Sequence, residues 1–476
     1  MGSATPTTTN SSGDRFYISR RFALLWAGTL LSALGDMIFE FTLIVWAAQQ
    51  FGQSGSWLVS GIFVASLIPT IIVGPIAGTL VDQGRDKVRV VVRASAAIAG
   101  LTILLAPLLA DDLFGLGPSL PTAFQTTVLL GAVCAISAIN QFIRPATSII
   151  SRDIVAEADR PRAASLNQVA FGIVILVGPP LAAPLFISFG LTWALALNAA
   201  SFVACAALVR LAARGAVLEE GQDRVLESPV VVAAFRERAG VVWTDLVAGL
   251  RLFGKSPTLT TVAVGMVIAM VGFGALNAID IFFVIFNLGG SEDIYGWFGT
   301  AEGAGSLIGA GVASVIVGRL GMPALFAGSL GLIGVLTLIY AQMTSIPAGL
   351  VLIFAFGLLA PALSIALSPI MLLVTPRAYL GRVGGTLNPL INVAMLVGVL
   401  AGGIVYGSLG ESFSVRLLGV EFGALDGLLT FTGLTSIAAA IYAWRRFASA
   451  AVRAEMAAAP GREPSVPAGS MEPLTP

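Results

Sequence analysis

The amino-acid sequence predicts an all-α integral membrane protein with twelve transmembrane helices in two pseudo-symmetric six-helix bundles. Three features carry this prediction: an apolar composition, apolar runs of membrane-spanning length, and the segregation of basic residues between alternate connecting segments. Of the 476 residues, 57% are hydrophobic and 11% are charged. Soluble domains have about 25% charged and 45–50% apolar residues, so the composition places the chain in a membrane.

Each apolar run is long enough to cross the hydrocarbon core, which is about 30 Å thick and needs about 20 helical residues. The first run is too long for the core of a signal peptide and no cleavage-site pattern precedes it, so we expect it to remain as a span. The twelve predicted spans are residues 22–49, 57–81, 90–110, 123–146, 163–188, 191–211, 258–286, 294–318, 322–342, 346–373, 383–409 and 424–444.

Basic residues predict the orientation of these spans. All 26 arginines and lysines except Arg416 fall on the side that carries both termini. Cytoplasmic loops carry the excess of arginine and lysine, so we expect both termini in the cytoplasm and the chain in a plasma (inner) membrane. The other segments on that side are 82–89, 147–162, 212–257, 319–321 and 374–382.

The longest interior segment divides the chain into two repeats. At an offset of 240 residues, Trp57 aligns with Trp297 and Glu40 with Asp280. Such six-plus-six repeats favour two bundles that rock about a cavity at the membrane midplane. The predicted domains are a polar cytoplasmic tail (1–21), an N-terminal bundle (22–211), a cytoplasmic linker with an amphipathic helix (212–257), a C-terminal bundle (258–446) and a disordered cytoplasmic tail (447–476).

The composition also excludes several classes of function. The 26 basic and 26 acidic side chains cancel, which leaves no case for a nucleic-acid-binding surface. The chain has no histidine, which excludes His-dependent catalytic triads, His-ligated metal sites and His proton relays. Cys134 and Cys205 lie alone in apolar stretches, so we expect neither a disulfide framework nor a CxxC metal site.

Four acidic residues lie within predicted spans. Asp36 lies near the middle of the first span, and Glu40 follows one helical turn later on the same face. A carboxylate at this depth costs roughly a few kcal/mol to insert or is protonated, so it can bind a proton when occluded and release it when hydrated. Asp280 and Glu302 lie in the outer halves of the seventh and eighth spans. All four are candidate proton-coupling or cavity residues, with hydrogen bonding to a neighbouring span as the structural alternative.

Polar amides accompany these acids. Asn277, Asn388 and Asn392 are candidates for orienting a substrate, and interhelical hydrogen bonding is the alternative. Four acids within the spans without a buried lysine predict a cavity that favours cationic substrates or protons.

The turn after the second span is a candidate cytoplasmic gate. Gly78 permits close helix packing, and Asp82 at the membrane boundary is followed by Arg85 and Lys87, either of which can pair with it across the bundles. Positive-inside anchoring by the bases is compatible with this role. Arg144, at the inner end of the fourth span, is assigned either to interfacial anchoring or to proton or anion coupling.

The fifth span carries a candidate seam between the bundles. Proline removes a backbone donor and glycine permits close backbone approach, and Gly172, Gly178 and Pro179 combine both properties. A plain proline kink is the alternative. The glycine-rich stretches 303–305 and 309–311 lack the lysine and hydroxyl residue of a phosphate-binding loop, so they indicate helix packing.

These residues give the chain a family likeness. Over residues 20–446 it resembles the major facilitator superfamily, whose loop motif G-x-L-x-D-R-x-G-R-R/K is similar to the segment from Gly78 to Arg89. Leu80 and Asp82 match that motif, and Gln83 departs from it. The fifth span loosely resembles the antiporter motif G-x-x-x-G-P-x-x-G through Gly178-Pro179, with Ala182 in place of the last glycine.

A finer likeness is to the macrolide-efflux and enterobactin-exporter branch of that superfamily. It is carried by Leu34-Gly35-Asp36, Pro145-Ala146, Gly249-Leu250-Arg251 and Gly381-Arg382-Val383. The resemblance implies proton-driven export of amphipathic small molecules, with Asp36 as the acid. We expect a monomer in the lipid bilayer that exchanges a small-molecule substrate for protons, with no cofactor or metal.

Proton-coupled export is therefore the predicted function, with drugs such as macrolides or a siderophore-like metabolite as substrate. A proton symporter that imports a nutrient has the same fold with reversed coupling. A transporter-like receptor without turnover is the alternative from another class. An intramembrane enzyme is disfavoured because no histidine is available to a nucleophile–base set.

Overall fold

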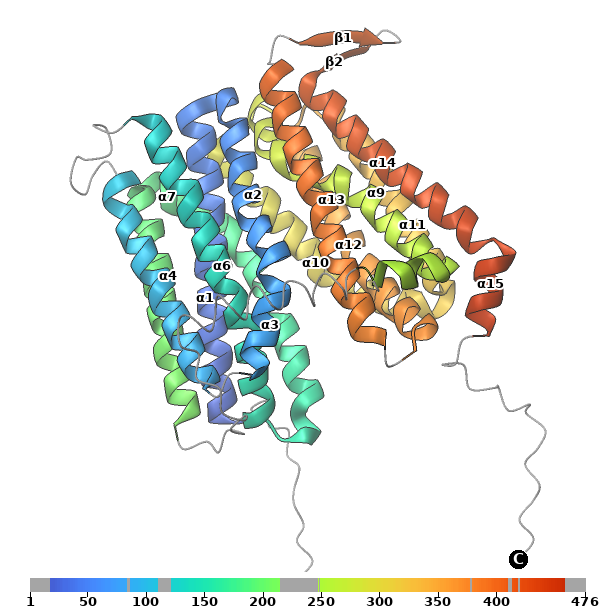
Figure 1. Cartoon of the computed structure of the whole chain (residues 1–476). Helices are drawn as coiled ribbons and strands as arrows, with labels where there is room; N and C mark the ends of the chain where they lie inside the picture. The colour runs from blue at the N-terminus through green and yellow to red at the C-terminus, as the bar shows by residue number, and fades with distance from the viewer. Residues whose placement is uncertain are drawn as a thin grey trace, which may run out of the picture.

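The computed structural model describes residues 18–83, 86–109, 121–214, 247, 249–376, 379–409, 413–417 and 420–458. Within these ranges the chain is almost entirely helical, and its helices form two bundles that lie side by side (Figure 1). The N-terminal bundle contains α1 (Arg20–Phe51), α2 (Ser56–Ile72), α3 (Gly74–Gln83), α4 (Lys87–Leu109), α6 (Thr122–Ile154) and α7 (Arg160–Ala213).

The C-terminal bundle begins with α9 (Pro257–Phe282), which a π-helical turn extends over Phe283–Asn287. It continues with α10 (Glu292–Leu320), α11 (Met322–Tyr340), α12 (Ile346–Val374), α13 (Leu380–Leu409) and α14 (Ala424–Phe447), and a short α15 (Ala450–Ala457) follows. Strands β1 (Ser414–Leu417) and β2 (Val420–Gly423) form an antiparallel hairpin between α13 and α14.

The number of membrane crossings agrees with the twelve predicted spans. Ten described helices are long and apolar enough to cross a membrane, and α2 with α3, bent by 46°, makes an eleventh crossing. Helix α7 has 54 residues, or about 80 Å of helix at 1.5 Å per residue, which is more than twice the hydrocarbon thickness. Gly190 breaks it with φ 74° and ψ 178°, so the chain turns back there and α7 supplies two crossings.

Local capping residues explain where several of these helices begin. The Ser19 hydroxyl accepts a hydrogen bond from the Phe22 amide at 3.1 Å and caps α1. Ser256 caps α9 in the same way and is followed by Pro257 in the first turn. Serine satisfies an amide that has no partner within the helix, and proline has none to satisfy.

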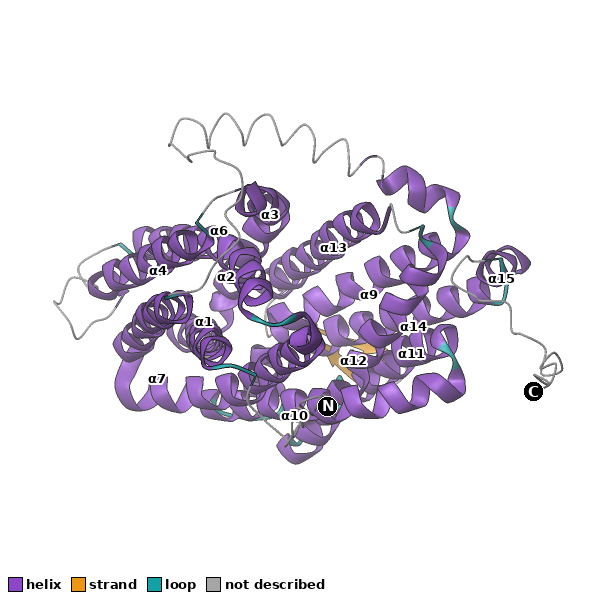
Figure 2. Cartoon of the chain, turned by 90° about the horizontal axis from the view of Figure 1, so that it is seen from below, coloured by secondary structure: helices purple, strands orange, loops and turns teal. Residues whose placement is uncertain are grey.

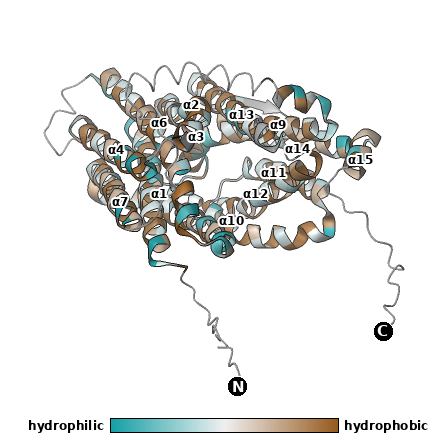
Figure 3. Cartoon of the chain, turned by 60° about the horizontal axis from the view of Figure 1, so that its bottom comes forward, coloured by the Kyte–Doolittle hydropathy of each residue, from teal (hydrophilic) through white to brown (hydrophobic). Residues whose placement is uncertain are grey.

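Arginines gather at one end of both bundles. Arg152, Arg210, Arg319, Arg445 and Arg446 lie in the last turns of α6, α7, α10 and α14. Arg20 and Arg160 begin α1 and α7. We call this the arginine-rich end; it is the lower end in Figure 1, and the β1–β2 hairpin lies at the opposite end. Figure 3 shows hydrophobic residues along both bundles, as expected of surfaces that face lipid.

Two pairs of helices make most of the contact between the bundles, α7 with α10 and α2 with α13, and Figure 2 shows each pair side by side. In the first pair, a Cβ atom placed on Gly296 would lie 2.7 Å from the Pro179 carbonyl oxygen, and one on Gly303 would lie 2.9 Å from the Ile175 carbonyl. In the second pair, a Cβ atom on Gly403 would clash with the Ser60 side chain. Only glycine permits the approach of two backbones that the first pair shows.

These contacts lie away from the arginine-rich end. They involve the first halves of α2 and α10, whereas a Cβ on Gly311 or Gly318, further along α10, would meet no atom within 4 Å. The same holds for Gly384 and Gly385 in the first turns of α13. The bundles are therefore packed together at the hairpin end and separated at the arginine-rich end.

Three sequence expectations differ from the structure or lie outside it. The β1–β2 hairpin was not expected, because its eight paired residues lie in a short connection between spans. The prediction of a disordered tail from 447 is wrong for its first part, since Val452 of α15 is buried and the Glu455 carboxylate accepts hydrogen bonds from the Thr258 amide at 2.8 Å and hydroxyl at 2.6 Å. Most of the predicted linker helix lies outside the described residues, and residues 249–255 are helical.

Candidate functional site

A cavity of about 800 Å³ lies within the N-terminal bundle. Its walls come from α1, α2, α6 and the first crossing of α7, and it extends from Phe22 and Arg160 at the arginine-rich end to Asp36 and Glu40. No described residue of the C-terminal bundle lines it. The sequence predicts a midplane cavity walled by both bundles. The described residues instead line a cavity in the N-terminal bundle alone, because the bundles separate at this end.

Asp36 and Glu40 occupy the deep part of the cavity. The Asp36 carboxylate accepts a hydrogen bond of 2.7 Å from the Asn140 amide, which joins α1 to α6. Glu40 lies one turn further along α1 and close enough to Asp36 for the two carboxylates to interact electrostatically. Glu40 accepts no hydrogen bond from any described residue. The spacing of four residues places both acids on the cavity face of α1, as expected from the sequence.

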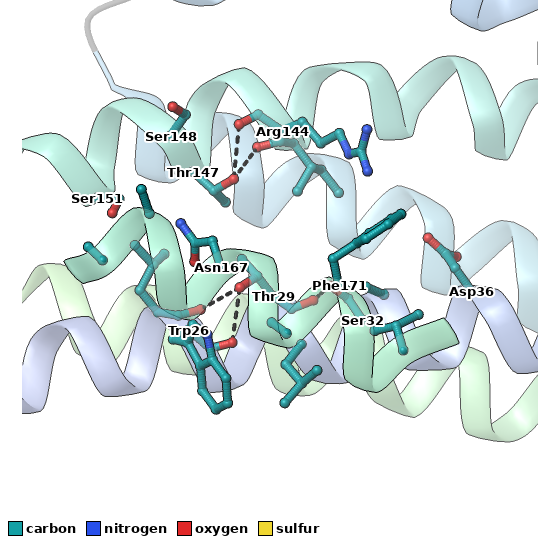
Figure 4. A pocket seen from close by; sticks show the side chains of 18 of the residues that line it. Trp26, Thr29, Ser32, Asp36, Arg144, Thr147, Ser148, Ser151, Asn167 and Phe171 are labelled. Atoms are coloured by element: carbon teal, nitrogen blue, oxygen red, sulfur yellow. Dashed lines mark hydrogen bonds between the residues drawn. The ribbon is translucent and has the colours of Figure 1, made fainter. Parts of the chain in front are cut away.

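One face of α6 lines the cavity with polar side chains. Asn140, Arg144, Ser148 and Arg152 follow one another at intervals of four residues and all line it, because residues four apart share a helix face. Figure 4 shows Arg144, Ser148 and Asp36 along the cavity. The Arg144 guanidinium forms no ion pair with a described carboxylate, although it lies within electrostatic range of Asp36.

Aromatic residues complete the walls. Phe22, Trp26 and Phe171 line the cavity, and the Trp26 indole donates a hydrogen bond of 2.9 Å to the Leu166 carbonyl. That bond holds the indole of α1 against α7, so its ring face is presented at a fixed position. The cavity therefore offers both flat apolar surface and charged groups to a ligand.

The other two acids form a separate cluster in the C-terminal bundle. The Tyr340 hydroxyl donates a hydrogen bond of 3.0 Å to the Asp280 carboxylate, and Glu302 lies within electrostatic range of Asp280. Tyr295 is buried beside both acids. Its ring stacks on Phe41 of α1, with ring centroids 5.7 Å apart. Asp280 and Glu302 thus lie close to the joined end of the bundles and do not share a cavity with Asp36.

The three candidate amides do not line the cavity either. Asn277 donates a hydrogen bond of 2.8 Å to the Phe273 carbonyl of its own helix. Asn388 is exposed and Asn392 is half-buried, and neither forms a hydrogen bond with the described part of the chain. The structure therefore provides no contact between these amides and the Asp36 site.

The gate residues are only partly described. A Cβ on Gly78 would meet no atom within 4 Å, so the turn is not packed against the other bundle at this residue. Lys87 is buried at the start of α4, and the neighbouring Asp86 forms an ion pair of 2.8 Å with Arg89. The side chain of Asp82 and the whole of Arg85 lie outside the described residues. Arg144 belongs to the cavity rather than to this turn.

The seam residues lie at or beside the contact between the bundles. Pro179 packs against Gly296 and Gly299 of α10, and Gly172 lies opposite Leu307. Gly178 faces Met37 of α1 within its own bundle. The glycine-rich stretch of α10 is a packing surface, since Gly303 lies against α7 whereas Gly305 and Gly309 lie against α12.

Sequence reasoning missed several cavity residues. Asn140 was overlooked although it lies four residues before Arg144, and that spacing was sufficient to find it. Arg152 and Arg160 were assigned only to the positive-inside pattern. Trp26 and Phe171 are indistinguishable from other aromatic residues in apolar spans, so only the structure shows that they line the cavity.

Comparison with known proteins decides the family. The family model of the Major Facilitator Superfamily matches residues 25–287. The chain belongs to the major facilitator superfamily. It is a multi-pass membrane transporter of this type and not an enzyme, and its all-helical membrane fold is the one predicted.

Individual relatives agree with this assignment. The chain is 25% identical over 421 residues to the uncharacterized MFS-type transporter YfiS of Bacillus subtilis (strain 168), covering 86% of this chain and 92% of that one. It is 23% identical over 384 residues to YkuC of the same organism, covering 79% and 83%. A bacterial homologue of the iron transporter ferroportin has a similar fold, with a TM-score of 0.67 at 15% identity and coverage of 90% and 99%.

Proposed function

We propose that this transporter exports amphipathic small molecules in exchange for protons by alternating access, with Asp36 as the principal proton-coupling residue. The observation that carries the proposal is the environment of Asp36. Its carboxylate lies in an open cavity and is held by a neutral amide, Asn140, rather than by a paired cation. A proton or a cationic substrate group can therefore bind to it without breaking an ion pair.

The orientation follows from the arginine-rich end. Cytoplasmic segments of membrane proteins carry the excess of arginine and lysine, so we place this end and both termini in the cytoplasm of a plasma membrane. The bundles are then separated on the cytoplasmic side and joined on the outer side. In this state the cavity receives substrate from the cytoplasm, as an exporter requires.

The transport cycle uses competition between substrate and proton. A proton that enters from outside in the opposite state neutralises Asp36 or Glu40, weakens binding of a cationic group and permits return to the state described. By linkage, binding of substrate promotes release of the proton. The likeness to the macrolide-efflux branch supports amphipathic drugs or a related metabolite as substrates.

Accumulation of labelled amphipathic drugs in an efflux-deficient bacterium tests this function. Cells that express the chain should accumulate less drug, and a protonophore should reverse the difference. Asp36→Asn should abolish the protonophore-sensitive efflux while the protein remains expressed. Asp293→Asn is the matched control, because it replaces an exposed acid outside the cavity and should transport normally. Normal gradient-driven efflux by Asp36→Asn would exclude Asp36 as the coupling residue.

A nutrient importer remains the second candidate because it uses the same fold with reversed coupling. Proteoliposomes with a controlled pH gradient separate the two. Export requires substrate movement against the direction of proton flow, whereas import requires both to move together.

A further inference from the structure

Charge is unevenly distributed along the cavity. Asp36 and Glu40 form its deep part, whereas Arg144, Arg152 and Arg160 line it towards the arginine-rich end. Helix α6 provides the scale, since Asn140 contacts Asp36 and Arg144 follows one turn later. Four residues of helix span about 6 Å, and the eight from Arg144 to Arg152 span about 12 Å. Arg160 forms an ion pair of 3.9 Å with Glu157. Arg144 and Arg152 are therefore the arginines that make the cavity positive towards its mouth, whereas its deep end is negative.

This distribution changes the substrate class expected from the sequence. The expectation of a cavity that favours cations assumed that four acids share it. Asp280 and Glu302 do not line it, and three arginines do. A substrate with only a positive charge would have to pass Arg144 and Arg152, and one with only a negative charge would have to lie beside two carboxylates.

Several polar groups along the cavity are also free to bind a ligand. Neither the Ser148 hydroxyl nor the Asn167 amide forms a hydrogen bond with any described residue, and the Arg144 guanidinium has no ion-pair partner there. In Figure 4 the Phe171 side chain lies between Arg144 and Asp36 in this view. Arg144 and Asp36 are therefore two separate charged positions along an apolar wall.

We propose that the cavity binds a dipolar amphipathic substrate. Its cationic group lies at Asp36 and Glu40, its carboxylate or other oxyanion lies at Arg144, and its apolar body lies against Trp26 and Phe171. Arginine binds oxyanions through two parallel hydrogen bonds, and Ser148 supplies a further donor. This substrate class rests on the proposed transport function, but the charge separation can be measured without transport.

Single cysteines probe the two ends of the cavity. Ser148→Cys lies on α6 between Arg144 and Arg152, and Ala33→Cys lies on α1 beside Asp36; both positions are exposed in the cavity. In purified protein in nanodiscs, we would measure the rates of modification by the anionic 2-sulfonatoethyl and the cationic 2-trimethylammonioethyl methanethiosulfonate. The ratio of the two rates cancels the ionisation of the thiol. The unmodified chain measures the background from Cys134 and Cys205.

The two positions should prefer reagents of opposite charge. A unit charge about 6 Å away in a water-filled cavity changes the rate of each reagent roughly threefold. The change is in opposite directions for the two reagents, so the ratio of their rates should differ about tenfold from the ratio at a reference cysteine outside the cavity. The reference is Ser345→Cys, an exposed position between α11 and α12 that lies outside the cavity and has no charged residue near it in the sequence. Arg144→Gln should reduce the anion preference at Ser148→Cys, and Asp36→Asn should reduce the cation preference at Ala33→Cys. The same ratio at both positions, or ratios that these changes leave intact, would overturn the proposal.

Matched ligands test the dipolar substrate itself. Phenylalanine carries both charges, its methyl ester only the positive charge, and N-acetylphenylalanine only the negative charge, on one aromatic body. Phenylalanine should slow modification at both cysteines more than either derivative does. If the methyl ester protects as well as phenylalanine, the dipolar class is wrong. These binding measurements use no proton gradient, so a negative result would exclude the dipolar substrate but not proton-coupled export. Conversely, if the cysteines show the expected charge preferences but cells show no export, only the proposed transport function is wrong.

Discussion

The two bundles hold their acidic residues in different ways. In the N-terminal bundle, Asp36 and Glu40 line an open cavity, and the only described hydrogen-bond partner of Asp36 is a side-chain amide on another helix. In the C-terminal bundle, Asp280 is bound by Tyr340 and lies with Glu302 beside a buried tyrosine near the joined end. Depth in the membrane therefore does not separate the two pairs of acids, whereas access to the cavity does.

The repeat makes this difference informative. Glu40 and Asp280 occupy aligned positions in the two halves, yet one lines the cavity and the other accepts a hydrogen bond from a tyrosine. We infer that the N-terminal acids serve substrate and proton binding, and that the C-terminal cluster supports the contact between the bundles through Tyr295 and Phe41.

The largest effect is expected where the bundles meet. Gly303→Leu should reduce transport at least about 100-fold, because even a Cβ at this position would lie 2.9 Å from the backbone of α7 and a close glycine contact cannot absorb a larger side chain. The measurement is drug efflux at matched expression. Gly311→Leu is the control on the same helix, since its Cβ would meet no atom within 4 Å; equal losses in both variants would show that the contact is not specific.

A smaller effect on transport is expected from the partner of Asp36. Asn140→Ala removes the hydrogen bond to the carboxylate and should reduce proton-coupled efflux about tenfold, a loss equivalent to one charge-assisted hydrogen bond. Thermal stability should change little because Asn140 lines an open cavity. Thr127→Ala is the control on the same helix, because this exposed hydroxyl lies outside the cavity and donates its hydrogen bond to the Ala123 carbonyl of α6 itself; this variant should retain normal efflux.

The smallest effect on transport is expected from the partner of Asp280. Tyr340→Phe removes the hydroxyl that donates to the half-buried Asp280 carboxylate, and the loss of this hydrogen bond costs about 1 kcal/mol. The thermal midpoint of the detergent-solubilised protein should therefore fall, while efflux stays within roughly threefold of normal. Tyr442→Phe, which changes a half-buried tyrosine of α14, is the control. A loss of efflux as large as that of Asn140→Ala would remove the distinction between the two acid sites.

The fold was largely predictable from the sequence, for identifiable reasons. Hydropathy and the arginine pattern predict twelve spans, because the hydrocarbon thickness sets the length of each crossing and the cytoplasmic connections carry the excess of arginine and lysine. The turn at Gly190 separates the two predicted spans that make up α7. The β1–β2 hairpin and α15 were not predictable, because both depend on contacts outside the apolar spans.

The candidate site was predictable only in part. The depth of Asp36 in the first span makes it a candidate without a structure, since a carboxylate there is costly. Depth makes Glu40, Asp280 and Glu302 candidates as well. The partner of Asp36, Asn140, is 104 residues away, and the separation of Asp36 from Asp280 depends on how the bundles diverge. Hydropathy predicts neither the Asp36–Asn140 contact nor the separation of Asp36 from Asp280. The prediction that all four acids share one cavity could therefore be corrected only from the three-dimensional arrangement.

Asp36 and Asp280 can be compared in one assay that reports proton coupling directly. Asp36→Asn and Asp280→Asn would be reconstituted into proteoliposomes with an internal pH-sensitive dye, and substrate-dependent proton movement would be recorded with a drug identified by the accumulation assay. We predict that Asp36→Asn moves no protons with substrate and that Asp280→Asn retains at least about one third of the normal rate. Proton movement abolished in Asp280→Asn and preserved in Asp36→Asn would contradict the assignment of coupling to the N-terminal bundle.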